Sequence, residues 1–160
     1  MKPTQAESFR LFAAELVSQS KEVFVKDGTH GEMFFLIAEN GQGTIMPIVK
    51  SVDRDDLVAV LKQRIQQENI FGIVHIAESW SYFPRGEHDH TMKQLALGEI
   101  KVAELTPGDR REALVVMAQC RDGYHCMWIT PILREGDKVR LGPTLDFDER
   151  SEGRFAGLFE

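Results

Sequence analysis

One stretch of the chain, residues 70–83, limits the possible folds more than any other. Its residues alternate between two faces, and both faces are apolar as far as Ala77. A strand that is apolar on both faces is covered on both sides, which is typical of the centre of a sheet. Beyond Ala77 only one face stays strongly apolar. The sequence therefore predicts a long central strand.

Two amphipathic helices are expected, over residues 1–20 and 53–68. The first opens with a Thr-x-x-Glu capping box at Thr4, and apolar residues then recur at helical spacing. The second has Asp53 as its N-cap and two aspartates in its first turn, where negative charge is favourable. Between the helices, residues 23–25 have the composition of a short strand.

Most of the other apolar segments form hairpin patterns. Residues 33–49 and 112–133 each contain two strand-like runs joined by a turn, and 138–141 indicates a last short strand. Pro47 and Pro131 lack an N–H group, which places their strands at an edge or a bulge. The predicted fold class is α+β, a mainly antiparallel sheet of about five to six strands with two helices packed on one face. A local crossover before the long strand would make the sheet mixed.

The chain has 160 residues, which favours a single domain over 1–160. A long connection, 84–111, is charged and interrupted by glycine and proline, as functional or mobile connections often are. The tail, 146–160, is charged and then apolar. Its apolar end is expected either to fold back on the helices or to dock on a second copy.

The charge balance limits the possible partners. The chain has 19 Lys and Arg against 25 Asp and Glu, a net charge of −6. General nucleic-acid binding requires a basic face and is not expected. No run reaches the roughly 20 apolar residues of a membrane-spanning helix, and the first residues lack the pattern of an export signal. We therefore expect a soluble cytoplasmic protein with no membrane segment.

The two cysteines, Cys120 and Cys126, flank Asp122-Gly123, which favours a two-residue hairpin turn. Such a turn would pair Cys120 with His125 and put Cys126 on the other face, so no disulfide is expected. A turn of three or five residues would instead place the two cysteines opposite each other. Free thiols fit a reducing cytoplasm.

The sharpest polar cluster is Glu87-His88-Asp89-His90, in the long connection. Two imidazoles separated by one residue, with carboxylates beside them, suit zinc or iron. His88 and His90 are therefore the candidate metal ligands. A further ligand would come from another segment, and the candidates are Glu32, Glu78, His30 and His75.

The His-x-His pair is similar to that of the JAMM-type zinc isopeptidases. Gly98 and Lys101 stand where that family has its serine and aspartate. Zinc-dependent hydrolysis at the His88/His90 loop is the alternative to a protein without a cofactor.

Other side chains have simpler interpretations. His75 lies inside an apolar strand and is expected to be a hydrogen-bonded core residue, and Glu78 falls on the opposite strand face, so the two do not predict a dyad. Trp80, Tyr82 and Trp128 either belong to the core or line a pocket for a small ligand.

Three motifs carry a family resemblance. They are Glu78-Ser79-Trp80 at the end of the long strand, a Pro-x-x-Arg-x-Glu strand entry at Pro107, and Pro131-Ile-x-Arg before a glycine turn. Together they resemble, over roughly residues 70–142, a loose group of small bacterial and phage-encoded α+β proteins. That group has no assigned activity, so the resemblance implies no catalytic residue.

No complete catalytic set is present in the sequence. We therefore expect a non-enzymatic binding or self-assembling domain, whose ligand the sequence does not identify. Symmetric dimers are the commonest oligomers, so a homodimer is expected. The 138–141 strand, protected only by its lysine and arginine, is a candidate edge for pairing.

Overall fold

The computed structural model describes residues 4–83, 89–105, 110–147, 155 and 157–159. The elements in chain order are α1 (Gln5–Asp27), β1 (Met33–Ala38), β2 (Gly43–Pro47), α2 (Arg54–Gln67), β3 (Ile70–Ser81), α3 (His90–Ala96), the 3-10 turn η1 (Val102–Glu104), β4 (Arg111–Cys120), β5 (His125–Glu135), β6 (Lys138–Leu141) and β7 (Leu145–Phe147).

The described strands form one sheet in the order β2-β1-β3-β4-β5-β6, with β7 beside β5. Every pairing is antiparallel, which confirms the α+β class and excludes a mixed sheet among these strands. The described part of the chain has seven strands, and β7 is the one that the sequence did not predict. β3 lies between β1 and β4, as predicted, and Val74 at its centre is completely buried.

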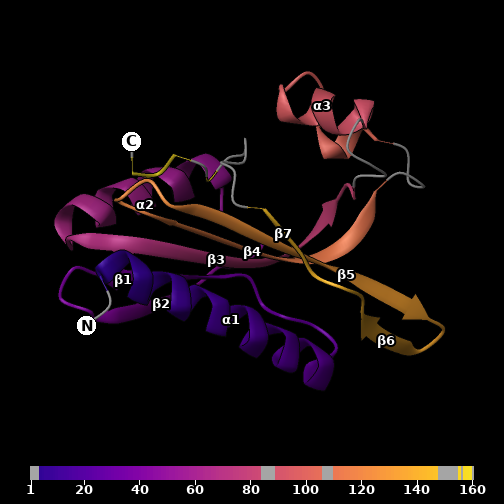
Figure 1. Cartoon of the computed structure of the whole chain (residues 1–160), viewed down its shortest axis with the longest axis horizontal. Coiled ribbons are helices and arrows are strands. Elements are labelled where there is room, and N and C mark those ends of the chain that lie inside the picture. Colours follow the sequence, from indigo (N-terminus) through magenta and orange to yellow (C-terminus); the bar gives the residue numbers. More distant parts are fainter. Residues whose placement is uncertain (1–3, 84–88, 106–109, 148–154, 156, 160) are drawn as a thin grey trace.

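The helices α1 and α2 cover opposite faces of the sheet (Figure 1). On one face, Phe9 and Phe24 of α1 belong to a buried cluster with Val74. On the other face, Leu61 of α2 packs in a second cluster with Phe34 of β1. The prediction that both helices share one face is therefore wrong. Both faces of β3 are apolar, so each face needs its own cover.

The first helix is longer than predicted and takes up residues 23–25, which the sequence indicated as a strand. Thr4 forms both bonds of the predicted capping box, and Gly28, with φ +74°, ends the helix in the left-handed conformation. Phe24 continues the buried stripe of the helix and is completely buried. Packing against the sheet therefore outweighs the strand propensity of its two valine neighbours.

The helix α2 agrees with its prediction. It begins directly after Asp53, whose carboxylate accepts hydrogen bonds from the backbone N–H groups of Asp55 and Asp56. This cap fixes the position of Arg54, the first residue of the helix.

The helix α1 and the strand β3 approach most closely at Gly72. A Cβ atom built at this position would lie 2.4 Å from a ring carbon of Phe9. The absence of a side chain at Gly72 therefore lets the Phe9 ring lie directly on the sheet.

The turn between β4 and β5 has three residues rather than two. The N–H of Cys120 donates to the carbonyl of Tyr124, and Gly123 takes a φ of +84°. A three-residue hairpin loop uses such a left-handed position to form its bulge. Cys126 consequently lies opposite Ala118, on the same face as Cys120 and not on the other face. The expectation that a three-residue turn would place the two cysteines opposite each other is also wrong, because Cys120 pairs with Tyr124. Both cysteines are buried free thiols, as predicted.

The two strand prolines lie where a missing N–H costs nothing. Pro47 is in β2, the outermost strand on one side of the sheet. Pro131 lies where the outer side of β5 changes partner, between residues 127–129, which pair with β7, and residues 132–135, which pair with β6. Pro47 confirms the predicted edge strand. β5 is an inner strand, and Pro131 lies in the gap between its two outer partners, where no N–H partner is required.

The end of the chain folds back onto its own domain. Leu158 is buried in the cluster under α2. The side-chain amide of Gln119, itself buried, donates to the carbonyl of Phe155 at 2.6 Å and accepts from the N–H of Leu158 at 3.2 Å. Of the two alternatives left open by the sequence, the described part of the tail adopts the first.

Candidate functional site

A cleft of about 1140 Å³ lies on the face of the sheet that α2 covers. The start of α2 lines one side with Arg54, Asp55 and Val58. Another side is formed around the end of α3 by Leu95, Gly98, Ile100 and Lys101. Both helices stand over the same face of the sheet in Figure 1. Residues of β3 and β4 are also in the lining, together with Phe155 from the folded-back tail.

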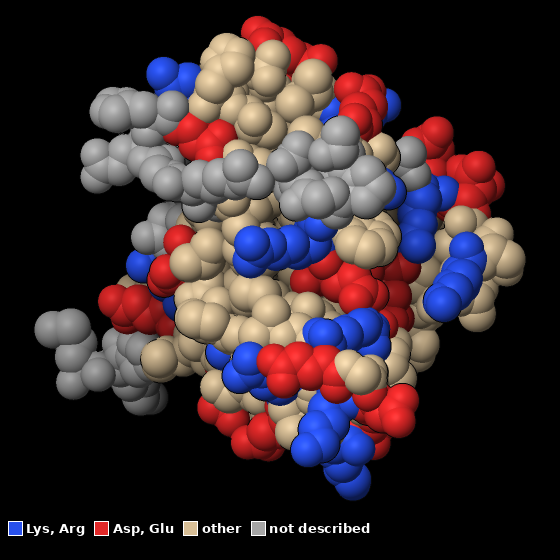
Figure 2. Space-filling view, turned by 90° about the vertical axis from the view of Figure 1, so that its right-hand side faces the viewer, with Lys and Arg blue, Asp and Glu red and all other residues tan. Residues whose placement is uncertain are grey.

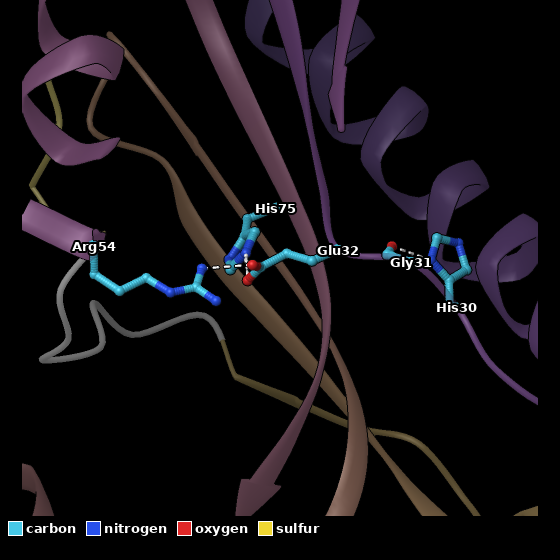
Figure 3. A network of polar contacts seen from close by, with 5 residues as sticks. All are labelled: His30, Gly31, Glu32, Arg54 and His75. Atoms are coloured by element: carbon cyan, nitrogen blue, oxygen red, sulfur yellow. Dashed lines mark hydrogen bonds and ion pairs between the residues drawn. The ribbon is translucent and has the colours of Figure 1, made fainter. Parts of the chain in front are cut away.

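Three charged or titratable side chains meet in this cleft (Figure 3). Glu32, just before β1, accepts a hydrogen bond from Arg54 with its Oε1 atom at 2.5 Å. Its Oε2 atom is 2.9 Å from Nε2 of His75 in the middle of β3. Glu32 thus bridges an arginine and a histidine that come from a helix and a strand.

The imidazole of His75 is held between two aromatic rings. It stacks on Phe34 with ring centres 4.2 Å apart and meets Phe155 edge-on at 5.0 Å. Phe34 is the direct neighbour of His75 across the β1–β3 ladder. This packing directs Nε2 toward Glu32. The predicted hydrogen bond is therefore present, but His75 is only partly buried and lines the cleft instead of lying within the core.

The pKa of Glu32 reflects opposing influences. Burial of the carboxyl group raises the pKa, whereas the hydrogen bonds from His75 and Arg54 and the electrostatic interaction with these two residues lower it. The net result is a pKa below the ordinary value of 4.5. Glu32 is therefore ionised at neutral pH and holds Arg54 in place as a carboxylate.

We expect Glu32→Gln to lower the free energy of unfolding at pH 7 by about 2 kcal/mol, because it removes a charge-assisted hydrogen bond. The folded-state pKa is lowered, so the carboxylate stabilises the fold above about pH 4.5 and loses this contribution as the pH falls through the folded value. The difference between the two proteins should shrink at pH 3. Urea titrations at both pH values measure it. Equal differences at the two pH values would contradict the assignment.

The other predicted partners of the metal site take different contacts. Glu78 lines the cleft but accepts a hydrogen bond from the hydroxyl of Thr29 at 2.9 Å. His30 is buried and its ring contacts the carbonyl of Gly31 at 2.7 Å, away from Glu32 (Figure 3). Of the four candidates for a further ligand, the structure brings only Glu32 and His75 into direct contact.

Arg54 is the site residue that the sequence analysis missed. A helix signal identified its segment, but an arginine at the first position of a helix carries no mark of function. The sequence indicated only that Arg54 follows the N-cap Asp53 and therefore lies at the start of the helix.

Of the two proposed metal ligands, the structure describes only His90. His88 lies outside the described residues. His90 begins α3, directly after the N-cap Asp89, whose carboxylate accepts from the N–H of Met92. Among the residues that the structure describes, no group of three or more histidine, cysteine or acidic side chains is arranged to hold a metal. Metal binding by His88 and His90 stays a prediction.

The aromatic residues considered as a ligand pocket lie elsewhere. Trp80 is half exposed and has the guanidinium of Arg110 over its ring at 5.2 Å. The hydroxyl of Tyr82 donates to Asp89 at 2.5 Å. Within the described lining of the cleft, neither these two residues nor Trp128 is present.

The cleft also contains a hydroxyl group. Ser79 lines it, but its hydroxyl donates to the carbonyl of Trp80 at 3.2 Å. In the described structure no hydrogen bond joins Ser79 to His75. The arrangement therefore offers charged and apolar contacts to a ligand rather than a paired nucleophile and base.

The surface charge is mixed on the end of the molecule that Figure 2 faces. Basic and acidic side chains lie beside one another there, and no broad basic field is visible. No helix of the described chain is long and apolar enough to cross a membrane.

These features define an α+β domain with an open cleft of mixed polarity on one face of an antiparallel sheet. The family model for bacteriophage lambda protein ea47 matches residues 1–160, and the chain belongs to this family. The membership agrees with the phage-encoded origin implied by the resemblance, whereas its motifs stay predictions. No curated protein and no solved structure matches the chain.

Proposed function

We propose that this chain is a non-enzymatic binding protein whose cleft holds an extended peptide segment of a partner protein. The observation that carries this proposal is a single open cleft of about 1140 Å³ whose lining contains both charged and apolar side chains. Small-molecule pockets hold roughly 300–1000 Å³. A cleft above that range has room for several residues of a peptide.

The lining of the cleft holds the cations Arg54 and Lys101 beside the carboxylates Glu32, Asp55 and Glu78, so an acidic group on the occupant would bind at the two cations. Glu32 is engaged by Arg54 and His75, and Glu78 accepts a hydrogen bond from Thr29. Lys101, on the opposite wall, has no ion pair among the described residues, and the side chain of Arg54 is 31% exposed beside its one bond to Glu32. A peptide carboxylate would accept hydrogen bonds from these two cations.

The rest of the lining favours apolar side chains. Val58, Val115 and Phe155 come from α2, β4 and the tail and give the cleft an apolar surface. Peptide recognition of this kind combines a few directed polar contacts with burial of apolar anchors. The expected ligand is thus a short segment in which acidic and apolar residues are mixed.

Peptide selection tests the proposal. Random octapeptides displayed on phage are selected on the wild-type protein, and an enriched peptide is synthesised with a fluorescein label. Fluorescence anisotropy then compares Lys101→Glu with Lys62→Glu, an equal charge reversal at an exposed residue of α2 outside the cleft lining. We expect Lys101→Glu to weaken binding about tenfold, which corresponds to ~1.4 kcal/mol, and Lys62→Glu to leave it within about twofold.

A second pair of variants tests the apolar wall. Val58→Glu places a charge in the lining, whereas Val60→Glu places one on the same helix outside it. Only Val58→Glu should abolish binding. Selection that enriches no peptide, or enriched peptides that bind all four variants equally, would contradict the proposal.

The assembly and location of the protein also belong to this proposal. The protein is proposed to act as a homodimer in the cytoplasm, with no bound cofactor and without general nucleic-acid binding. The free thiols of Cys120 and Cys126 support a reducing compartment. The net charge of −6 supports a partner other than nucleic acid.

A further inference from the structure

The outer side of β2 is an open sheet edge. β2 is the last strand on its side of the sheet and pairs only with β1. Within the described residues, no backbone hydrogen bond reaches its outer side. An open edge is a template for another extended chain.

The ladder shows which backbone groups point outward. The N–H of Ile48 donates to the carbonyl of Glu32, and the N–H of Ala38 donates to the carbonyl of Gln42. These bonds lie at the two ends of the β1–β2 ladder, and all four residues that form them have even numbers. Because hydrogen-bonded pairs of an antiparallel ladder recur at every second residue, the residues of β2 that turn toward β1 are those at even positions.

The odd residues of β2 therefore direct their backbone groups away from the sheet. Gly43 and Ile45 present both an N–H and a carbonyl group, and Pro47 presents a carbonyl group alone. These groups are symmetric about Ile45 except for the missing proline N–H. An antiparallel copy centred on Ile45 matches them.

We propose that two copies of this chain join through β2, antiparallel about a two-fold axis at Ile45. The N–H of each Ile45 donates to the carbonyl of the other, and the N–H of each Gly43 donates to the carbonyl of Pro47 in the second copy. The two sheets become one continuous sheet. The inference rests on the homodimer proposed above and is independent of the peptide cleft.

The side chains of β2 support a second copy as the occupant. The strand has no charged residue, and Ile45 is 58% exposed. Ile45 also forms the rim of an apolar groove of about 480 Å³ whose lining includes Phe12, Phe35 and Ile37. The Ile45 side chain of the second copy would cover this rim, and both copies would lose the same exposed apolar surface.

The edge strand at the opposite end of the sheet, β6, has charged residues, which β2 lacks. β6 carries Lys138 and Arg140, and Arg140 pairs with Glu135 at 2.8 Å. Charged residues on an edge strand oppose pairing with another chain. The structure thus shifts the expected pairing edge from 138–141 to β2.

Light scattering of the full-length protein at tens of micromolar tests the interface. The wild type should have twice the monomer mass of 18.2 kDa. Ile45→Lys should give the monomer mass. Val25→Lys, at a residue of α1 that is 65% exposed, should remain a dimer. A monomeric wild type would overturn the homodimer, whereas a dimeric Ile45→Lys protein with a native circular dichroism spectrum would overturn this interface only.

Cross-linking tests the register without disturbing Ile45. In the proposed pairing Thr44 faces Met46 of the second copy in a pair without hydrogen bonds, where Cα atoms are roughly 4.5 Å apart. The double variant Thr44→Cys/Met46→Cys should therefore form a dimer linked by disulfides on oxidation. Thr44→Cys alone should form none, since it faces a methionine. Equal cross-linking of the two variants, or none in either, would overturn the register.

Discussion

Replacing Val74 by aspartate is expected to leave the protein unfolded or insoluble. Val74 lies in the middle of β3, is completely buried and packs beneath α1. An aspartate there would either bury a charge without a partner or take up a proton, and both cost free energy. A loss of roughly 5 kcal/mol or more is comparable to the whole stability of many domains.

The matched control is Val60→Asp, at a valine of α2 that is 44% exposed. We expect its urea midpoint to stay close to that of the wild type. Soluble yield and urea unfolding followed by circular dichroism measure both proteins. A Val74→Asp protein that unfolds cooperatively at the wild-type midpoint would contradict the central position of β3.

The second large effect is expected from Phe34→Ala, with a loss of about 3–5 kcal/mol in the free energy of unfolding. Phe34, a residue of β1, is completely buried in the cluster beneath α2 and stacks on His75. Truncation would open a cavity directly beneath the imidazole. His75 would then lose one of the two rings that orient it toward Glu32.

Phe34→Leu provides the comparison, since leucine fills most of the cavity and should cost less. Urea unfolding gives the two stabilities, and NMR titration of the His75 ring shows whether the imidazole keeps its environment. If Phe34→Ala and Phe34→Leu cost the same, the cavity is not the source of the loss. An unchanged His75 titration in Phe34→Ala would contradict the role of the stack.

Much of the fold follows from local sequence signals. The capping residues Thr4 and Asp53 located the starts of both long helices, because a cap is formed within one turn of the chain. The two apolar faces of β3 predicted its central position, and Pro47 predicted the edge strand. Each of these signals acts over a few residues, so the sequence around it is sufficient.

The turn at Gly123 shows where local signals stop being sufficient. Asp122-Gly123 predicted a turn, and a turn is present, but its length depends on how β4 and β5 align along their whole ladder. The position of α1 is similar. Its amphipathic stripe predicted that one face is buried, but the stripe does not specify which face of the sheet it covers.

The candidate site depended on the tertiary structure. The sequence named Glu32 and His75 only as separate candidates for a further ligand of a metal at His88 and His90, and it gave no reason to include Arg54. Glu32 lies 43 residues from His75 and 22 from Arg54, and the β1–β3 register together with the start of α2 brings the three together. The sequence by itself determined the helices, the central strand and the proline edge, because these arise from contacts between near neighbours. Only the tertiary structure decided which face each helix covers, where the tail lies and which charged groups meet, because these depend on long-range packing and strand register.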